Sequence, residues 1–318
     1  MDKHILDFER PIIELENKIR EMKDLSVSGD LKLNDEISRL EEKAKRLRRD
    51  IYSKLTRWQK VQLARHPQRP YTLDYLERMT SSYIEIHGDR AFKDDPAIIG
   101  GLAKIENQSL VIIGHQKGRT TKEKLYRNFG MPHPEGYRKA LRIMKLAAKF
   151  KRPIVTLIDT IGAYPGLGAE ERGQAEAIAK NLFEMSHLPV PILIIVIGEG
   201  ASGGALGIGV GDRVLMMQNT WYSVISPEGC AAILWRDSTK AEQAAEAMKL
   251  TPRDLIEMGV VDGVIDEPEG GAHRDHDAAA EILKKTITEE LYNLKQIPID
   301  QLLEQRLQKF GKMGYWTE

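Results

Sequence analysis

The chain is short of cysteine, of net charge and of long apolar runs, and each shortage excludes a class of protein. Its single cysteine, Cys230, rules out a disulfide framework and a zinc site built on several thiolates. Lys and Arg number 47, as do Asp and Glu, so no overall field attracts nucleic acid. The longest strongly apolar run, residues 190–197, cannot cross a bilayer, and the first residues lack the features of a signal or transit peptide. We therefore expect a cytoplasmic protein that binds neither membranes nor nucleic acid.

Charge is unevenly distributed although the total is zero. Residues 115–152 contain twelve Lys or Arg against two Glu, whereas residues 228–290 contain fifteen acidic residues against seven basic ones. Solvated helix faces account for many such clusters. An anionic ligand would nevertheless find its countercharge in the first of these segments.

The first 65 residues differ from the rest because they are charge-rich and poor in glycine. Apolar residues recur there at spacings of three and four, which is typical of amphipathic helices. The two sets are Ile5, Ile12, Leu15, Ile19 and Met22, then Ile37, Leu40, Ala44, Leu47 and Ile51. A turn at residues 26–30 would join them into an antiparallel helical hairpin. We expect this hairpin, residues 1–65, to serve subunit assembly, and the prolines after His66 to open a second domain, residues 66–318.

The second domain alternates short apolar runs with helical periodicity, which predicts an α/β domain with a largely parallel sheet. The expected strands are residues 97–105, 109–114, 154–158, 192–197, 213–217 and 260–265. The expected helices are residues 136–151, 170–186 and 278–310.

One glycine-rich turn allows several interpretations. Gly198-x-Gly200-x-x-Gly203 has the spacing of a dinucleotide fingerprint, but the next strand ends in Gln218 where that motif needs an acidic residue. Paired amides of Gly203 and Gly204 could instead form an oxyanion hole, with the positive end of a helix dipole behind them. A turn with glycines for packing alone remains a further interpretation.

The same turn also matches a serine nucleophile elbow, Gly200-x-Ser202-x-Gly204. A hydrolase would need an acid and a histidine downstream, and the chain offers Asp262 or Asp266 with His273 or His276. The two histidines also have a spacing seen in metal sites, but only Asp275 and Asp277 lie near them, and we expect no metal in this chain.

A second glycine turn, residues 159–166, follows the preceding apolar run. Loops after successive parallel strands lie beside each other at one edge of a sheet. Amides of Gly162 and Ala163 therefore form a second candidate pair, and donors from the two loops could converge on one oxygen.

Six blocks of the chain closely resemble the α-subunit family of bacterial acetyl-coenzyme A carboxylase carboxyltransferases, in order and spacing over nearly the whole length. They are residues 64–75 (ARHPQRPYTLDY), 114–119 (GHQKGR), 127–140 (RNFGMPHPEGYRKA), 159–174 (DTIGAYPGLGAEERGQ), 198–204 (GEGASGG) and 223–235 (SVISPEGCAAILW). One departure is Ile161, which stands where the family commonly has proline.

The resemblance implies a crotonase-like (ClpP/crotonase) fold of repeated ββα units. It also implies transfer of a carboxyl group from carboxybiotin on the biotin carboxyl carrier protein to acetyl-CoA, giving malonyl-CoA for fatty-acid biosynthesis. The implied partners are a β subunit in an α2β2 assembly, which carries the family's zinc, and biotin carboxylase. A serine hydrolase and a scaffold subunit without a chemical role are the alternatives.

Site roles follow from the same resemblance. Gly203 and Gly204, with Gly162 and Ala163 as the second pair, would stabilise the biotin ureido oxygen. Arg172 would meet the transferred carboxylate, with a solvated or salt-bridged residue of the helix as the alternative. Five further cations would contact CoA phosphates or the acidic carrier: Lys117, Arg119, Lys122, Lys124 and Arg127.

Overall fold

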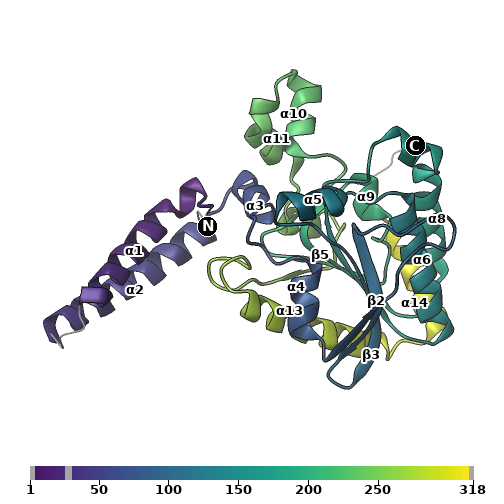
Figure 1. Ribbon diagram of the computed structural model, residues 1–318, viewed down its shortest axis with the longest axis horizontal. Helices are drawn as coiled ribbons and strands as arrows, with labels where there is room; N and C mark the ends of the chain where they lie inside the picture. The colour runs from purple at the N-terminus through teal and green to yellow at the C-terminus, as the bar shows by residue number, and fades with distance from the viewer. Residues whose placement is uncertain (1–3, 26–30, 315–318) are drawn as a thin grey trace.

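The computed structural model describes residues 4–25 and 31–314, and it consists of a sheet covered by helices with a helical hairpin projecting from one side (Figure 1). Within the described residues, no helix combines the length and apolar character needed to cross a membrane. The expected α/β class is therefore observed, and the hairpin is a separate arm.

The sheet has eight strands in the described part of the chain, in the order β1-β2-β3-β4-β5-β6-β8, with β7 paired to β5. Strands β1 to β3 are antiparallel neighbours, and the pairs from β3 onward are parallel. The bounds are β1 Ser82–Glu85, β2 Ile98–Ile105, β3 Gln108–His115, β4 Ile154–Thr160, β5 Ile192–Ala201, β6 Arg213–Met217, β7 Trp221–Ser223 and β8 Gly263–Ile265. The carboxyl ends of β3, β4 and β5 consequently meet at one edge.

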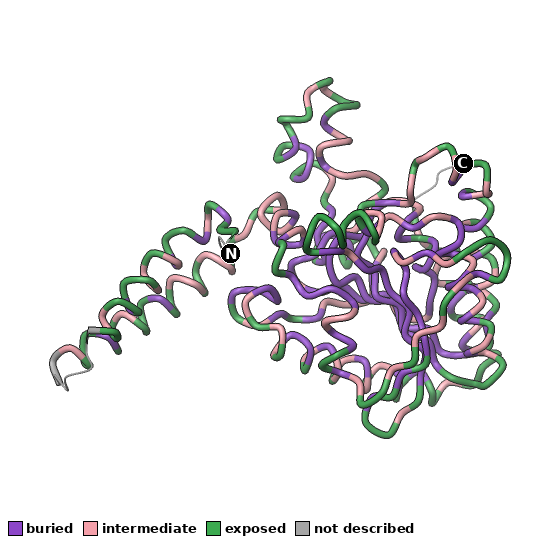
Figure 2. Tube along the Cα trace, in the orientation of Figure 1, coloured by how far each residue is buried: buried purple, intermediate pink, exposed green. Residues whose placement is uncertain are grey.

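Two apolar layers enclose the sheet, whose strands are the most continuously buried part of the chain (Figure 2). On one face, α4 (Thr72–Met79) and α13 (His276–Leu294) pack against strand residues such as Ile112 and Leu193. On the other face, α6 (Pro134–Lys149) and α8 (Gln174–His187) cover Val111 and Ile194. Alternation along each strand sends successive side chains to opposite layers, which explains why these strands are apolar throughout.

The predicted hairpin is formed by α1 (Arg10–Leu25) and α2 (Leu31–Ser53), preceded by the short helix η1 (Asp7–Glu9). Its apolar seam contains Ile19, Ile37 and Ala44, and an ion pair of 2.6 Å joins Lys23 to Glu41. The predicted turn at residues 26–30 lies outside the described residues. Helix α3 (Arg57–Ala64) packs instead against Ala201 and Trp221 of the body. The boundary at residue 65 and the assembly role both stay predictions.

Shorter elements complete the body. They are α5 Thr121–Tyr126, η3 Asn128–Gly130, α7 Leu167–Glu171, α9 Ser202–Leu206, α10 Pro227–Trp235, η4 Ser238–Lys240, α11 Ala241–Met248, α12 Pro252–Glu257 and α14 Ile299–Gly311.

Four predicted segments differ from the structure. The strand expected over residues 260–265 is observed only as β8, Gly263–Ile265. The strand expected to end at Ile197 continues to Ala201, because β7 pairs with its glycine-containing end and Thr160 pairs with Gly200. The helix expected over residues 170–186 is two helices, α7 and α8, since Gly173 between them has a positive φ of 80° and precedes α8 as its N-cap. The expected tail helix is likewise α13 and α14, separated near Pro298.

Candidate active site

The two predicted glycine loops lie against each other. A Cβ built on Gly204 would stand 2.4 Å from the carbonyl carbon of Gly162 and 2.5 Å from the nitrogen of Ala163. Gly162 itself has a φ of 143°, a conformation that L-residues with a side chain rarely adopt. Backbone of the β4–α7 loop is therefore in contact with the start of α9; the contact itself requires glycine at position 204, whereas position 162 favours glycine because of its φ.

The amides at this contact differ in their hydrogen bonding. The Gly162 amide donates to Oγ1 of Thr160 over 3.1 Å, so it already has an acceptor. The Ala163 amide has no acceptor within residues 4–25 and 31–314, and Gly203 and Gly204 lie in the first turn of α9 (Ser202–Leu206), where helix amides have no acceptor inside the helix. Of the four predicted donors, three can therefore bind an external oxygen without losing an internal bond.

Two helices of the body hold α9 in place. The hydroxyl of Tyr137, on α6, donates to the Gly204 carbonyl over 3.2 Å. The amide group of Asn181, on α8, donates to the Gly207 carbonyl over 2.8 Å. Ser202 has a positive φ of 56°, so the sharp change from strand to helix is made at the serine and not at Gly204.

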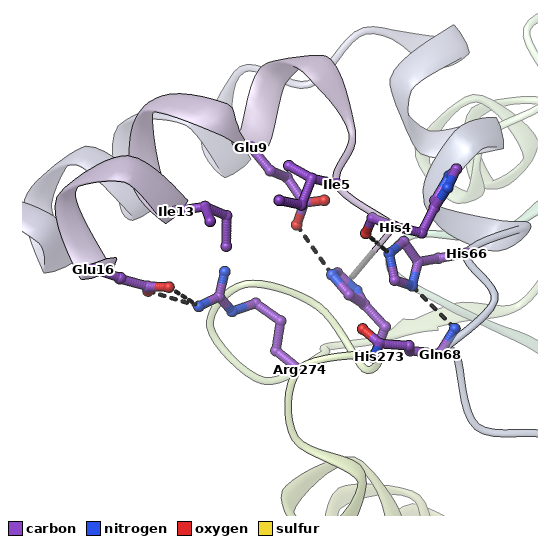
Figure 3. Close-up of a pocket in the computed structure, with 9 residues that line it drawn as sticks. All are labelled: His4, Ile5, Glu9, Ile13, Glu16, His66, Gln68, His273 and Arg274. Atoms are coloured by element: carbon purple, nitrogen blue, oxygen red, sulfur yellow. Dashed lines mark hydrogen bonds and ion pairs between the residues drawn. The ribbon is translucent and has the colours of Figure 1, made fainter. Parts of the chain in front are cut away.

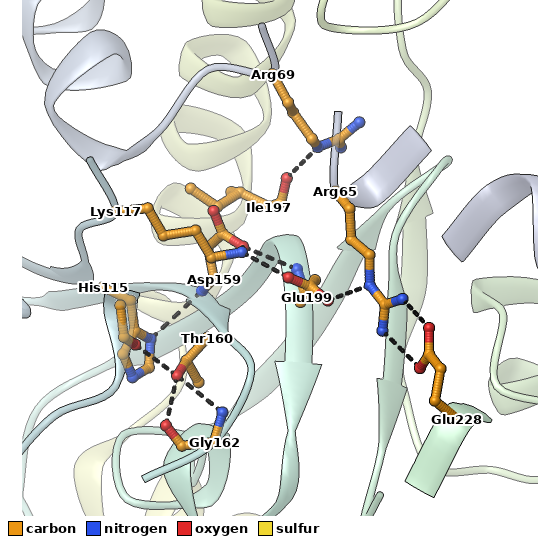
Figure 4. Close-up of polar contacts among 11 residues, drawn as sticks. Arg65, Arg69, His115, Lys117, Asp159, Thr160, Gly162, Ile197, Glu199 and Glu228 are labelled. Carbon is orange, nitrogen blue, oxygen red and sulfur yellow. Dashed lines mark hydrogen bonds and ion pairs between the residues drawn. The ribbon is translucent and has the colours of Figure 1, made fainter. Parts of the chain in front are cut away.

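A buried ion cluster lies beneath the loops, at the ends of β3, β4 and β5 (Figure 4). Nζ of Lys117 lies 2.6 Å from Oδ1 of Asp159 and 2.8 Å from Oε2 of Glu199. Glu199 also accepts from Nε of Arg65 over 2.6 Å, and Arg65 continues to Glu228. We call Lys117, Asp159 and Glu199 the lysine cluster, because its one ammonium holds two strand ends together.

Protonation in the lysine cluster follows from burial and pairing. Burial alone would lower the pKa of Lys117, but the two carboxylates outweigh it and raise that pKa. Burial likewise opposes ionisation of Glu199, yet Lys117 and Arg65 hold its pKa below the usual value. For Asp159 burial prevails and raises the pKa. Lys117 is therefore a charged structural cation at neutral pH.

Lys117, predicted to contact CoA phosphates or the carrier, has two internal carboxylate partners in the structure, and that role stays a prediction. Arg172 pairs with Glu135 and lies over the ring of Phe92, as the salt-bridged alternative expects, and its contact with the transferred carboxylate stays a prediction. In both cases the positive charge of the side chain compensates the negative charge of a carboxylate that is buried beside it.

The remaining predicted cations lie on or beside α5. Arg119 is 2.8 Å from Asp74, and Arg127 donates to the Pro96 carbonyl over 2.8 Å. Lys122 and Lys124 are exposed on α5. These two lysines remain available for an anionic ligand, whereas the arginines have partners in the protein.

Sequence reasoning missed His115, which is fully buried beside the lysine cluster. Its Nδ1 accepts from the Asp159 amide over 3.4 Å, and burial, assisted by Lys117, lowers its pKa to about 3. The ring is therefore neutral. A signal was present in the sequence, since His115, Asp159 and Glu199 are polar residues at or near the ends of apolar strands.

An apolar cavity of about 350 Å³ opens beside α9, lined by residues that include Ser202, Leu206 and Phe310. Large apolar side chains are also exposed around this edge of the sheet, among them Ile161, Leu167, Leu206, Val224, Ile233 and Leu234. Exposed apolar side chains near a polar site are typical of surfaces that bind a ligand or a partner.

Two of the competing interpretations of the glycine turn, the serine hydrolase and the dinucleotide site, do not fit the structure. His273 bonds to Glu9 and His276 bonds to the Gln68 carbonyl, so neither histidine completes a triad with Ser202. Because His273 and His276 bond to different partners, these two histidines do not form the metal-binding pair that their spacing suggested. Gly198 and Gly200 lie inside β5, which leaves no phosphate-binding turn of the dinucleotide type there.

Comparison with known proteins gives matches over nearly the whole chain. A family profile described as acetyl co-enzyme A carboxylase carboxyltransferase-like matches residues 5–314. Proteins named acetyl-coenzyme A carboxylase carboxyl transferase subunit alpha from Chlorobium luteolum and Methylococcus capsulatus are 57% and 56% identical. The alignments cover 99% and 100% of this chain, and 98% and 99% of those proteins.

Solved structures show the fold. Transcarboxylase 12S matches 69% of this chain with a TM-score of 0.54 and 21% identity, and the match spans 42% of that chain. A chain of a Pseudomonas malonate decarboxylase hetero-tetramer, solved with coenzyme A, matches 74% with a TM-score of 0.58 and 15% identity, over 91% of its own length. The predicted crotonase-like fold is thereby confirmed.

Proposed function

The chain belongs to the α-subunit family of acetyl-coenzyme A carboxylase carboxyltransferases, and on that premise we propose that its two glycine loops hold the biotin ureido oxygen during carboxyl transfer. The donors are the amides of Gly203 and Gly204, with Ala163 from the facing loop. Gly162 contributes by its backbone shape, since its own amide is already bonded to Thr160. In this arrangement only backbone amides act on the substrate, and no side chain serves as a nucleophile.

The chemistry needs fixed donors more than it needs a nucleophile. When carboxybiotin gives up its carboxyl group, negative charge develops on the ureido oxygen, and an amide that is already oriented stabilises that charge without reorganisation. Acetyl-CoA loses an α proton in the same exchange, and the released ureido nitrogen can accept it. The protein's part is to orient the two substrates and exclude water between them.

One observation carries the proposal: Gly204 is packed against Gly162 and Ala163, so that amides from two loops lie at one place. The apolar cavity beside Ser202 supports it, because a bicyclic ring with an aliphatic arm needs apolar walls and few polar groups. The exposed Lys122 and Lys124 are then the candidates for CoA phosphates or the carrier.

Partners follow from the same premise. We infer an α2β2 assembly with a β subunit that holds most of the acetyl-CoA and carries zinc, a biotin carboxyl carrier protein that delivers carboxybiotin, and biotin carboxylase upstream, all in the cytoplasm. The exposed apolar residues of α10, Ile233 and Leu234, support a partner surface near the site. The hairpin of α1 and α2 is proposed to strengthen assembly.

The isolated chain is expected to be inactive in carboxyl transfer, because half of the site belongs to another polypeptide. The assay is decarboxylation of malonyl-CoA in the presence of free biotin, with the chain alone and with a β subunit added. Activity should appear only with both subunits. Sustained turnover by the chain alone would contradict the shared site.

Ser202→Ala is expected to keep carboxyl transfer within about tenfold of the unmodified enzyme, a loss below about 1.4 kcal/mol in transition-state stabilisation. The reason is that the change leaves every backbone amide in place. Steady-state rates of the assembled enzyme check this, with a fluorophosphonate probe as the second measurement. A loss of several orders of magnitude, or labelling of Ser202, would favour a hydrolase.

A further inference from the structure

Three segments far apart in the sequence meet where the hairpin joins the body (Figure 3). Glu9 lies at the start of the hairpin, His66 follows α3, and His273 lies in the loop before α13. All three are buried, and one ligand atom from each lies within 4.8 Å of the others. Two imidazoles and a carboxylate form a donor set that zinc and similar ions prefer.

The contacts within this set already approach those around a single ion. Nε2 of His273 lies 3.0 Å from Oε1 of Glu9, and the rings of His66 and His273 have centroids 4.2 Å apart. With bonds of about 2.0–2.2 Å, two ligands of a tetrahedral ion stand about 3.4 Å apart. The three donors are therefore close to the spacing around one ion, and binding requires His66 to give up one of its bonds, from Nε2 to the His4 carbonyl or to Nδ1 from the Gln68 amide.

The ring of His273 has a buried nitrogen that no hydrogen bond explains. Its Nδ1 has no partner in the described part of the chain. A carboxylate lies near this nitrogen, because a Cβ built on Gly271 would stand 3.0 Å from Nδ1 of His273 and 3.7 Å from Oε2 of Glu267. Histidines that bind a metal through one nitrogen commonly donate the other N–H to a carboxylate or a water.

The surroundings of the set leave room for an ion. Oε1 of Glu9 accepts from the Tyr52 hydroxyl over 2.6 Å and lies 3.0 Å from Nε2 of His273, so the carboxylate is already oriented toward the ring. A cavity of about 280 Å³ adjoins the three side chains, with room for a water, and His4 lines it as well. The ring of His4 lies 5.5 Å from that of His66.

We propose that Glu9, His66 and His273 bind one divalent transition-metal ion, best matched by zinc, which clamps the hairpin to the body. The ion takes the place of the Nε2 proton of His273, and that proton moves to Nδ1. His4 or water completes the coordination. This revises the expectation that the chain holds no metal, and it is independent of carboxyl transfer, because the cluster shares no residue with the glycine loops.

The test uses the untagged full-length chain, stripped with a chelator and then titrated with Zn²⁺. We expect one ion per chain after dialysis, measured by mass spectrometry of the metal, and a higher melting temperature with Zn²⁺ than without. Glu9→Gln, His66→Gln and His273→Gln should each weaken binding at least about 100-fold, since outer-shell changes alone cost about 10–100-fold. His276→Gln is the matched control and should bind as the unmodified chain does.

A second readout follows the clamp itself. Zn²⁺ should slow amide hydrogen exchange at the start of α1 in the unmodified chain and in His276→Gln, but not in the three ligand variants. Thermal melting in chelator shows whether each variant folds. If the histidine variants do not fold, Glu9→Gln decides the test, because its amide oxygen can still accept from Tyr52. Absence of bound ion in the unmodified chain, or equal binding by all folded variants, would overturn the proposal.

Discussion

Gly204→Ala is expected to lower carboxyl transfer by at least about 100-fold while the two subunits still assemble. The new methyl group would stand within 2.8 Å of three backbone atoms of Gly162 and Ala163, so the facing loop must move. Movement of either loop displaces the amides from the ureido oxygen. The measurement is the rate with carboxybiotin carrier, taken together with thermal melting of the same complex, and Gly204→Val should have a larger effect.

Gly203→Ala is the matched control for this change. A Cβ there would meet only the side chain of Ile178, at an ordinary distance of 3.5 Å, and the amide would remain. Its activity should therefore stay within about tenfold of the unmodified enzyme. Equal losses in both variants would contradict the close-contact argument. Parallel losses of rate and melting temperature in Gly204→Ala would assign the glycine to packing, and an unchanged rate would refute the site.

Lys117→Met is expected to destabilise the fold by about 3–5 kcal/mol, because removing one partner of a buried ion pair leaves uncompensated charge. The lysine cluster would keep two carboxylates, Asp159 and Glu199, with no ammonium between them. Lys124→Met, on the exposed face of α5, is the control and should change stability by less than about 0.5 kcal/mol. Denaturant unfolding of the purified chains measures both.

The pH dependence of this deficit has a definite sign. Without Lys117, repulsion raises the folded-state pKa of the carboxylates above their unfolded values, so the folded state binds more protons. The penalty is full at high pH and is relieved as the pH falls through the raised pKa. The difference in unfolding free energy between Lys117→Met and the unmodified chain should therefore narrow on acidification. A difference independent of pH would show that lost packing, not charge, causes it.

The sheet was largely predictable from sequence because fully buried parallel strands leave a simple apolar signal. The run from Ile154 to Ile158 and the strand from Arg213 to Met217 were placed nearly to the residue. The end of β5 was not, because Gly200 and Ala201 join the sheet only through pairing with Thr160 and β7. Such pairing depends on distant segments and leaves no local pattern.

The candidate site was predicted in part. The prediction that two glycine loops lie side by side follows from the parallel strand order, and the contact of Gly204 with Gly162 agrees with it. The roles of Lys117 and Arg172 were less accessible, since a basic residue in a sequence does not reveal whether a carboxylate will be buried beside it. Glu199, a partner of Lys117, lies 82 positions away in the sequence, and Glu135, the partner of Arg172, lies 37 positions away.

Because the hairpin stands away from the body, a rotation at its base would displace its far end (Figure 1). Helix α2 has 23 residues, which corresponds to about 35 Å at 1.5 Å per residue. A rotation of about 10° at its base would move the far tip by about 6 Å, as the arc of a helix of that length. The few contacts at the base, such as the ion pair of Glu16 with Arg274 at 2.6 Å, therefore determine how far the tip reaches. Small changes at the base are magnified into large displacements at the distal end.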